Sequence, residues 1–177
     1  MFEEEKIFGY KDLVIKLYYA PGSLETYFSI NYSAQIDLPN TRPEEIKTRL
    51  TDLLIPGFYD NLETFMHKVE LDQTQFKPLG EKMGQYELDE CVFEFYHCTM
   101  STRGFKEYHG RLQLFLMWFI EGSSFIDQDD PKWEIMLLFK KKVNGMGNSE
   151  YSIVGYSTYY PFYCYPDQVR MRIRYII

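Results

Sequence analysis

Apolar and polar residues alternate along two stretches near the N-terminus. The first is residues 13–19, and in the second every other side chain from Leu24 to Ala34 falls on one face. A period of two is typical of β-strands that are buried on one face. Residues 20–23 lie between the stretches and include Pro21 and Gly22, which favour a tight turn. The pattern predicts a β-hairpin.

After the hairpin the spacing of apolar residues changes to three and four. Ile46, Leu50 and Leu53 follow this spacing, and Pro43 suits a first helical turn. We therefore predict a short helix that begins near Pro43 and stops at Pro56-Gly57. A second helical piece is expected within residues 61–70, and the Lys-Pro-Leu-Gly segment at residues 77–80 is a candidate domain junction.

The second half of the chain predicts five strands and one long helix. The strands are expected at residues 83–88, 91–99, 133–140, 151–160 and 169–177. The helix is expected at residues 105–120, where an apolar stripe with helical period comprises Tyr108, Leu112, Phe115, Leu116 and Phe119. In the last strand, Arg170, Arg172 and Arg174 fall on one face and Val169, Met171, Ile173, Tyr175 and Ile177 on the other. Together these patterns predict an α+β fold.

Composition narrows the class of protein. The chain has 177 residues and a formal net charge of -7, which disfavours nonspecific binding to nucleic acid. Its longest apolar run, residues 114–120, is far shorter than the roughly 20 residues of a membrane-spanning helix. The N-terminus is acidic, whereas a secretory signal is basic. Cys91, Cys98 and Cys164 form no CxxC pair, so we expect free thiols in a reducing compartment and a globular protein without a membrane segment.

Local motifs for metal or phosphate chemistry are missing from the sequence. It has no GxxxxGK[ST], GxGxxG, HExxH or GxSxG pattern. His67, His97 and His109 stand apart from other metal-ligating residues, so we expect ordinary core or surface histidines. An acidic loop formed by Asp127, Asp129 and Asp130 resembles the start of a calcium loop but lacks the glycine and the distal glutamate. A solvated loop is favoured, and no metal site is predicted.

Two features suggest recognition of a positively charged ligand. Glu121 directly follows the apolar helix, where a carboxylate could stand at the mouth of a cleft or simply cap the helix. Aromatic residues gather in the predicted hairpin after it: Trp133, Tyr156, Tyr159, Tyr160, Tyr163 and Tyr165. Their rings could hold a lysine side chain by cation–π contact, or could only fill the core. These residues predict, at most, an acidic and aromatic cleft in an α+β domain.

Several segments are similar to the type B histone acetyltransferase catalytic subunit family. In the first half they are Ile7-Phe8-Gly9-Tyr10-Lys11, Leu17-Tyr18-Tyr19 with Gly22-Ser23-Leu24, Ile55-Pro56-Gly57-Phe58 and Phe76-Lys77-Pro78-Leu79-Gly80. In the second half they are Arg103-Gly104-Phe105, Glu107-Tyr108-His109, Arg111-Leu112-Gln113, residues 115–121, residues 124–127, Gly155-Tyr156, Tyr160 and Tyr165-Pro166-Asp167. The similarity spans nearly the whole chain in the family's order.

The resemblance implies a histone acetyltransferase that moves an acetyl group from acetyl-CoA to a lysine on the tail of a newly made core histone. It implies a small N-terminal α/β domain, residues 1–75, followed by an antiparallel sheet with a packed helix, residues 76–177, that begins a GNAT acetyltransferase domain. Glu121 matches an acidic residue at the family's catalytic cleft, and we expect it to help accept the proton of the lysine. Trp133 and Tyr160 match residues that line the histone-peptide channel, and Glu5 matches an acidic residue that contacts the tail.

The resemblance also implies partners and places. It implies a core histone tail, a β-propeller histone chaperone whose usual N-terminal docking helix is absent here, no direct DNA binding, and both nucleus and cytoplasm. We expect the loop that binds the CoA pyrophosphate beyond Ile177, and therefore a truncated chain. Arg174 and Tyr175 stand where the family has smaller polar residues. A noncatalytic histone-tail binding module and a nonfunctional truncated product remain the alternatives to an enzyme.

Overall fold

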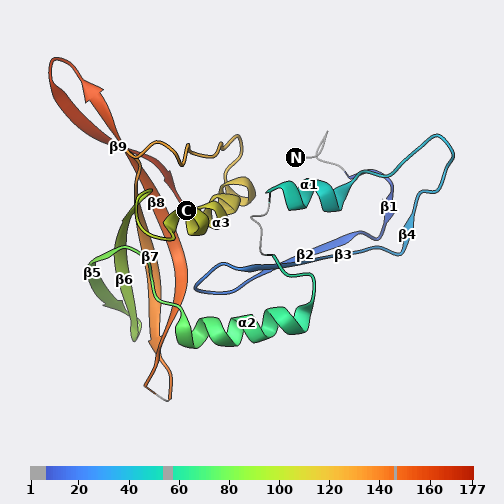
Figure 1. Ribbon diagram of the computed structural model, residues 1–177, viewed down its shortest axis with the longest axis horizontal. Coiled ribbons are helices and arrows are strands. Elements are labelled where there is room, and N and C mark those ends of the chain that lie inside the picture. Colours follow the sequence, from blue (N-terminus) through green and yellow to red (C-terminus); the bar gives the residue numbers. More distant parts are fainter. Residues whose placement is uncertain (1–6, 54–57, 146) are drawn as a thin grey trace. The chain divides into compact units, whose positions relative to one another are not determined.

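Figure 1 shows the chain as a computed structural model, which describes residues 7–53, 58–145 and 147–177. Glu5 and the helix stop predicted at Pro56-Gly57 lie outside the described residues. Helices and antiparallel strands both contribute to the structure, so the predicted α+β class is confirmed. Two compact units are present: Met1–Tyr19 with Glu25–His67, and Ala20–Leu24 with Lys68–Ile177. The domain boundary near residue 76 stays a prediction.

The first unit contains the predicted hairpin. Strand β2 (Val14–Tyr19) pairs antiparallel with β3 (Thr26–Asn31), and Phe28 of β3 is buried. β3 ends earlier than we predicted, because Ala34 belongs to a separate strand, β4 (Ala34–Gln35), which pairs with β1 (Tyr10–Lys11). Ala34 is exposed, so the alternation in the sequence continues past the end of the buried strand.

Helix α1 (Ile46–Leu53) begins three residues after the predicted start at Pro43. Pro43 instead packs against Gly9, where an added Cβ would lie 2.5 Å from the Pro43 Cβ. The Glu44 N–H donates to the Phe8 carbonyl over 3.1 Å, so these residues are bound to the segment before β1. Ile46 and Leu50 are buried, as their spacing predicts.

Helix α2 (Leu62–Gln75) is longer than the predicted piece at residues 61–70. Asn61 caps its start, because the Asn61 Oδ1 accepts a hydrogen bond from the Thr64 N–H at 3.0 Å. Farther along, the Asp72 carboxylate accepts hydrogen bonds from the N–H groups of Gly22 at 2.8 Å and Ser23 at 3.1 Å. These bonds, within the second unit, hold the turn at residues 20–24.

The second unit is built on a five-stranded antiparallel sheet in the order β5-β6-β7-β8-β9 (Figure 1). All five predicted strands are confirmed. Their bounds are β5 (Glu81–Leu88), β6 (Cys91–Thr99), β7 (Glu134–Val143), β8 (Ser149–Cys164) and β9 (Gln168–Ile176). β8 is longer than predicted, and its end forms a hairpin with β9 that projects from the sheet in Figure 1.

Helix α3 (Phe105–Phe119) packs on one face of this sheet. The Tyr108 ring lies 6.5 Å from that of Phe139 on β7, and the Tyr156 hydroxyl donates to the Leu112 carbonyl over 3.3 Å. The predicted stripe is correct as far as Leu116, but Phe119 is 70% exposed and its inclusion was wrong. The helix ends at Phe119, whose ring stacks on that of Phe115 instead of entering the core.

The strict alternation predicted for β9 is broken by a register shift. Tyr175 pairs with Thr158 and Ile173 pairs with Tyr159, so Arg174 has no counterpart on β8. A β-bulge of this kind places an extra residue in one strand and turns the side chains beside it. Among the described residues, no helix combines the length and apolar character needed to cross a bilayer.

Candidate functional site

A cavity of about 560 Å³ opens in the second unit beside the start of β7. We call it the Trp133 pocket. Its walls come from the loop after α3, from the start of β7 and from the projecting part of β8 and β9. The lining residues are Phe125, Ile126, Asp127, Asp130, Trp133, Tyr160, Phe162, Arg172, Ile173 and Arg174.

Aromatic rings form the floor of the pocket. The rings of Trp133 and Tyr160 lie 4.6 Å apart and are tilted by 57°, and the Tyr160 ring lies 5.1 Å from that of Phe162. Trp133 is only 6% exposed, so packing fixes its indole beside the cavity. The face of such a ring attracts cations. Two of the predicted site residues, Trp133 and Tyr160, are therefore brought together.

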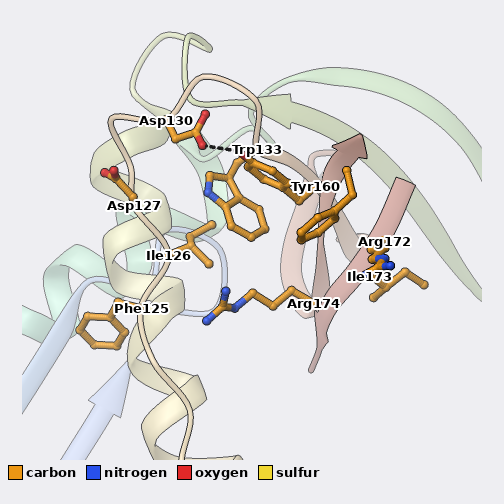
Figure 2. Close-up of a pocket in the computed structure, with 10 residues that line it drawn as sticks. Phe125, Ile126, Asp127, Asp130, Trp133, Tyr160, Arg172, Ile173 and Arg174 are labelled. Carbon is orange, nitrogen blue, oxygen red and sulfur yellow. Dashed lines mark hydrogen bonds between the residues drawn. The ribbon is translucent and has the colours of Figure 1, made fainter. Parts of the chain in front are cut away.

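Asp130 provides a carboxylate at the rim. The Tyr160 hydroxyl donates to Asp130 Oδ2 over 2.7 Å (Figure 2). The Lys132 N–H donates to Asp130 Oδ1 over 3.0 Å. The backbone bond from Lys132 is the larger cause, and Tyr160 the second, of a pKa for Asp130 below its ordinary value of 3.8. The hydrogen bond between Tyr160 and Asp130 also raises the pKa of Tyr160. Asp130 is thus ionised at neutral pH and the phenol keeps its proton.

Side chains of α3 hold the loop that brings Asp127 and Asp130 to the pocket. The Gln113 Oε1 accepts a hydrogen bond from the Ile126 N–H at 2.9 Å, and both residues are buried. The Gln128 amide lies 3.0 Å from Nδ1 of the buried His109. Burial lowers the pKa of His109 to about 4, so its imidazole is neutral at pH 7 and can accept this bond.

Two arginines stand on the β9 wall. Because of the bulge, Arg172, Ile173 and Arg174 all line the pocket although they are consecutive. The Arg172 guanidinium lies 4.7 Å from the centre of the Phe162 ring. The lining therefore has two aspartates and two arginines, and the net acidic cleft that the sequence suggested is balanced by charges on β9.

The other predicted site residues lie elsewhere. Glu121 is exposed in the turn directly after α3 and is not among the residues that line the pocket. Its catalytic role stays a prediction, and so does the role of Glu5, which lies outside the described residues. Tyr156 is buried in the core, and Tyr165 is 86% exposed at the tip of the hairpin. Of the tyrosines gathered in the sequence, Tyr160 is the one that lines the pocket.

Sequence reasoning missed the part played by Asp130, Arg172 and Arg174. The sequence predicts a solvated loop for Asp127, Asp129 and Asp130, and Asp129 is indeed exposed, with its Oδ1 2.8 Å from Lys106 Nζ. Within residues 7–53, 58–145 and 147–177, no three His, Cys, Asp or Glu side chains gather as metal ligands would. The position of Asp130, three residues before Trp133, was the available signal for its role in the pocket.

Comparison with known proteins identifies the family. A family model described as "Histone acetyl transferase HAT1 N-terminus" matches residues 1–121. The chain is 40% identical to the mouse histone acetyltransferase type B catalytic subunit, and the match covers 97% of the chain and 42% of the mouse protein. The human protein of that name is 39% identical with the same coverage. The Cryptococcus neoformans protein is 38% identical over 97% of the chain and 47% of its own length.

The chain thus spans a little under half the length of these curated relatives. The family match covers well over half of the chain itself and agrees with the resemblance seen in its motifs. The chain belongs to the histone acetyltransferase HAT1 N-terminus family, whose relatives here are named as type B catalytic subunits.

Proposed function

We propose that this protein acts in the acetylation of a lysine on the tail of a newly synthesised core histone, and that the Trp133 pocket receives part of that tail. One observation supports the pocket's role most strongly: the Trp133 and Tyr160 rings lie 4.6 Å apart beside the ionised Asp130. Rings and a carboxylate are the groups that bind a flexible, positively charged peptide. The names of the relatives support a histone as the substrate.

The proposed reaction needs a proton acceptor. The lysine Nζ attacks the carbonyl carbon of the acetyl-CoA thioester, a C–N bond forms, the C–S bond breaks and CoA leaves as the thiol. The ammonium must first lose a proton to a base. We propose Glu121 for this role, because it matches the family's acidic residue and its exposed side chain is accessible. We assign no residue between 7 and 177 to acetyl-CoA.

Partners and localisation follow from the same proposal. A core histone tail is the proposed substrate, and a β-propeller histone chaperone is the proposed companion subunit. Newly made histones travel from cytoplasm to nucleus, so we propose both compartments for the protein.

A noncatalytic tail-binding module is the second candidate function. The Trp133 pocket is assembled from residues 125–174 alone and needs no acetyl donor to complete it. Binding of a tail without transfer is therefore physically possible.

Calorimetric titration with a basic histone-tail peptide tests the proposal. We expect salt-sensitive binding by the native chain and binding about threefold to tenfold weaker by Tyr160→Leu, which removes one ring from the floor. Tyr165→Leu is the matched control, since Tyr165 is 86% exposed and lies outside the lining residues. Absence of binding, or equal affinities for the native chain and Tyr160→Leu, would refute the proposed role of the pocket in binding the tail. Mass spectrometry after adding acetyl-CoA separates the enzyme, which acetylates the peptide, from the module, which does not.

A further inference from the structure

The Arg174 side chain lies over the ring of Trp133, to which the proposed substrate would bind. Its guanidinium carbon is 5.9 Å from the centre of the Trp133 ring, within the range of a cation–π contact. The same guanidinium donates to the Ser124 hydroxyl over 2.9 Å and lies 5.2 Å from the Tyr175 ring. Figure 2 shows the Arg174 side chain reaching from β9 toward the indole. Trp133 thus already has a cation from its own chain.

The register of the sheet explains this position. Tyr175 and Ile173 both pair with β8, whereas Arg174 is the extra residue between them. The Tyr175 hydroxyl donates to the Ser124 carbonyl over 3.1 Å and fixes the loop on which Arg174 also bonds. Arg174 is therefore held at two points, by the bulge behind it and by Ser124 ahead of it.

A lysine entering the pocket would meet this arginine. An ammonium and a guanidinium repel each other, and at distances of a few ångströms the repulsion is large where water is partly excluded. Asp127 and Asp130 also line the cavity, and their carboxylates attract the same lysine. The lining therefore contains groups that attract a cation and groups that repel it, whereas a neutral side chain is not repelled by Arg174.

We propose that Arg174 determines the specificity of the Trp133 pocket: by holding its guanidinium against the indole, it lowers the affinity for a lysine ammonium relative to a neutral, acetylated lysine. This inference rests on the proposed function of the pocket.

The test compares Arg174→Gln with Arg170→Gln. Both variants lose one positive charge from β9, but Arg170 lies outside the lining residues, so it controls for net charge. A basic tail peptide and its lysine-acetylated copy are titrated against the native chain and both variants. Thermal unfolding checks that each variant is folded. We expect Arg174→Gln to bind the unmodified peptide at least about threefold tighter, and to change the acetylated peptide's affinity less.

Two results of the peptide titration would overturn the inference. The first is an equal change of affinity in Arg174→Gln and Arg170→Gln, because only net charge would then matter. The second is weaker binding of the unmodified peptide by Arg174→Gln. If none of the proteins binds the peptide, the proposed function fails, and n-butylammonium chloride then tests Arg174 alone. In that titration, the Trp133 indole N–H resonance should shift more on adding n-butylammonium in Arg174→Gln than in the native chain. Equal shifts, including none, contradict the inference.

Discussion

The Tyr160 hydroxyl donates a hydrogen bond to the Asp130 carboxylate over 2.7 Å and thereby joins strand β8 to the loop before β7. The two residues are thirty positions apart in the chain. The bond fixes the orientation of a carboxylate beside the aromatic floor of the Trp133 pocket, so the electrostatics of the pocket depend on it.

Removing the phenol oxygen should change the titration of Asp130. Two hydrogen bonds lower the pKa of this carboxyl, first that from the Lys132 N–H and second that from Tyr160. In Tyr160→Phe the first remains and the second is lost, so we expect the Asp130 pKa to rise toward 3.8. Carbon NMR of the Asp130 carboxyl during acid titration measures it. Tyr159→Phe is the control, because the Tyr159 hydroxyl accepts a hydrogen bond from Ser157 and not from a group of the pocket. An unchanged Asp130 pKa in Tyr160→Phe would show that the bond between Tyr160 and Asp130 is not formed in solution.

The buried Glu94 should contribute strongly to stability. Its side chain is 1% exposed and accepts hydrogen bonds from Lys82 at 2.7 Å, Lys141 at 3.1 Å and Tyr96 at 2.6 Å. Glu94→Gln removes the negative charge between two lysines, so we expect a loss of about 1–3 kcal/mol in the free energy of unfolding at pH 7. Urea denaturation measures the change, with Glu87→Gln on the exposed side of β5 as the control.

Acid should erase this difference. Burial alone would raise the pKa of Glu94, but the hydrogen bonds from Lys82, Tyr96 and Lys141 lower it below 4.5. A carboxyl whose pKa is lowered by folding stabilises the protein above its unfolded pKa, and this stability is lost as the pH falls through the folded pKa. The native chain and Glu94→Gln should therefore approach each other in stability below pH 4.5. A difference in stability that stays constant as the pH falls would contradict a lowered pKa for Glu94.

His109 should make the fold sensitive to mild acid. Burial lowers its pKa from 6.5 to about 4, so the unfolded chain binds more protons between these values and stability falls as the pH falls. We expect His109→Gln to lose about 3 kcal/mol less than the native chain across this interval. Urea denaturation at pH 6.5 and at pH 4 compares them, with the exposed His67→Gln as the control. Equal losses of stability between pH 6.5 and pH 4 in all three proteins would contradict a neutral, buried His109.

Gln113 should protect one backbone amide of the pocket loop. Its side chain accepts the Ile126 N–H at 2.9 Å, and an unsatisfied buried donor costs about 1–3 kcal/mol. In Gln113→Ala we therefore expect hydrogen exchange at Ile126 to be about tenfold or more faster. Gln128→Ala leaves this bond intact and should change Ile126 less. Equal acceleration in both variants would mean that the loop opens as a whole.

Local periodicity predicted much of the fold. β2, β6, β7 and α3 have an apolar face that repeats at the period of their element, and all four were found where the pattern placed them. The start of α1 was wrong because Pro43 packs against Gly9, a contact that no local pattern encodes. The end of the apolar stripe was wrong because α3 stops at Phe119.

The candidate site was predictable only in part. Trp133 and Tyr160 could be named from their resemblance to a family, and the structure brings them together. Arg174 could not, since its place in the pocket depends on the register between β8 and β9, which alternation within one strand does not determine. The bond between Tyr160 and Asp130 likewise depends on how two distant segments pair.

The central claim is that a basic histone tail binds on the indole of Trp133, and NMR of that indole N–H tests it most directly. The chain has two tryptophans, so a Trp118→Phe variant assigns the remaining signal to Trp133. Titration with the tail peptide should shift this resonance in a saturable way, with an apparent affinity that falls as salt rises. A peptide that binds while the Trp133 signal stays in place would contradict the account.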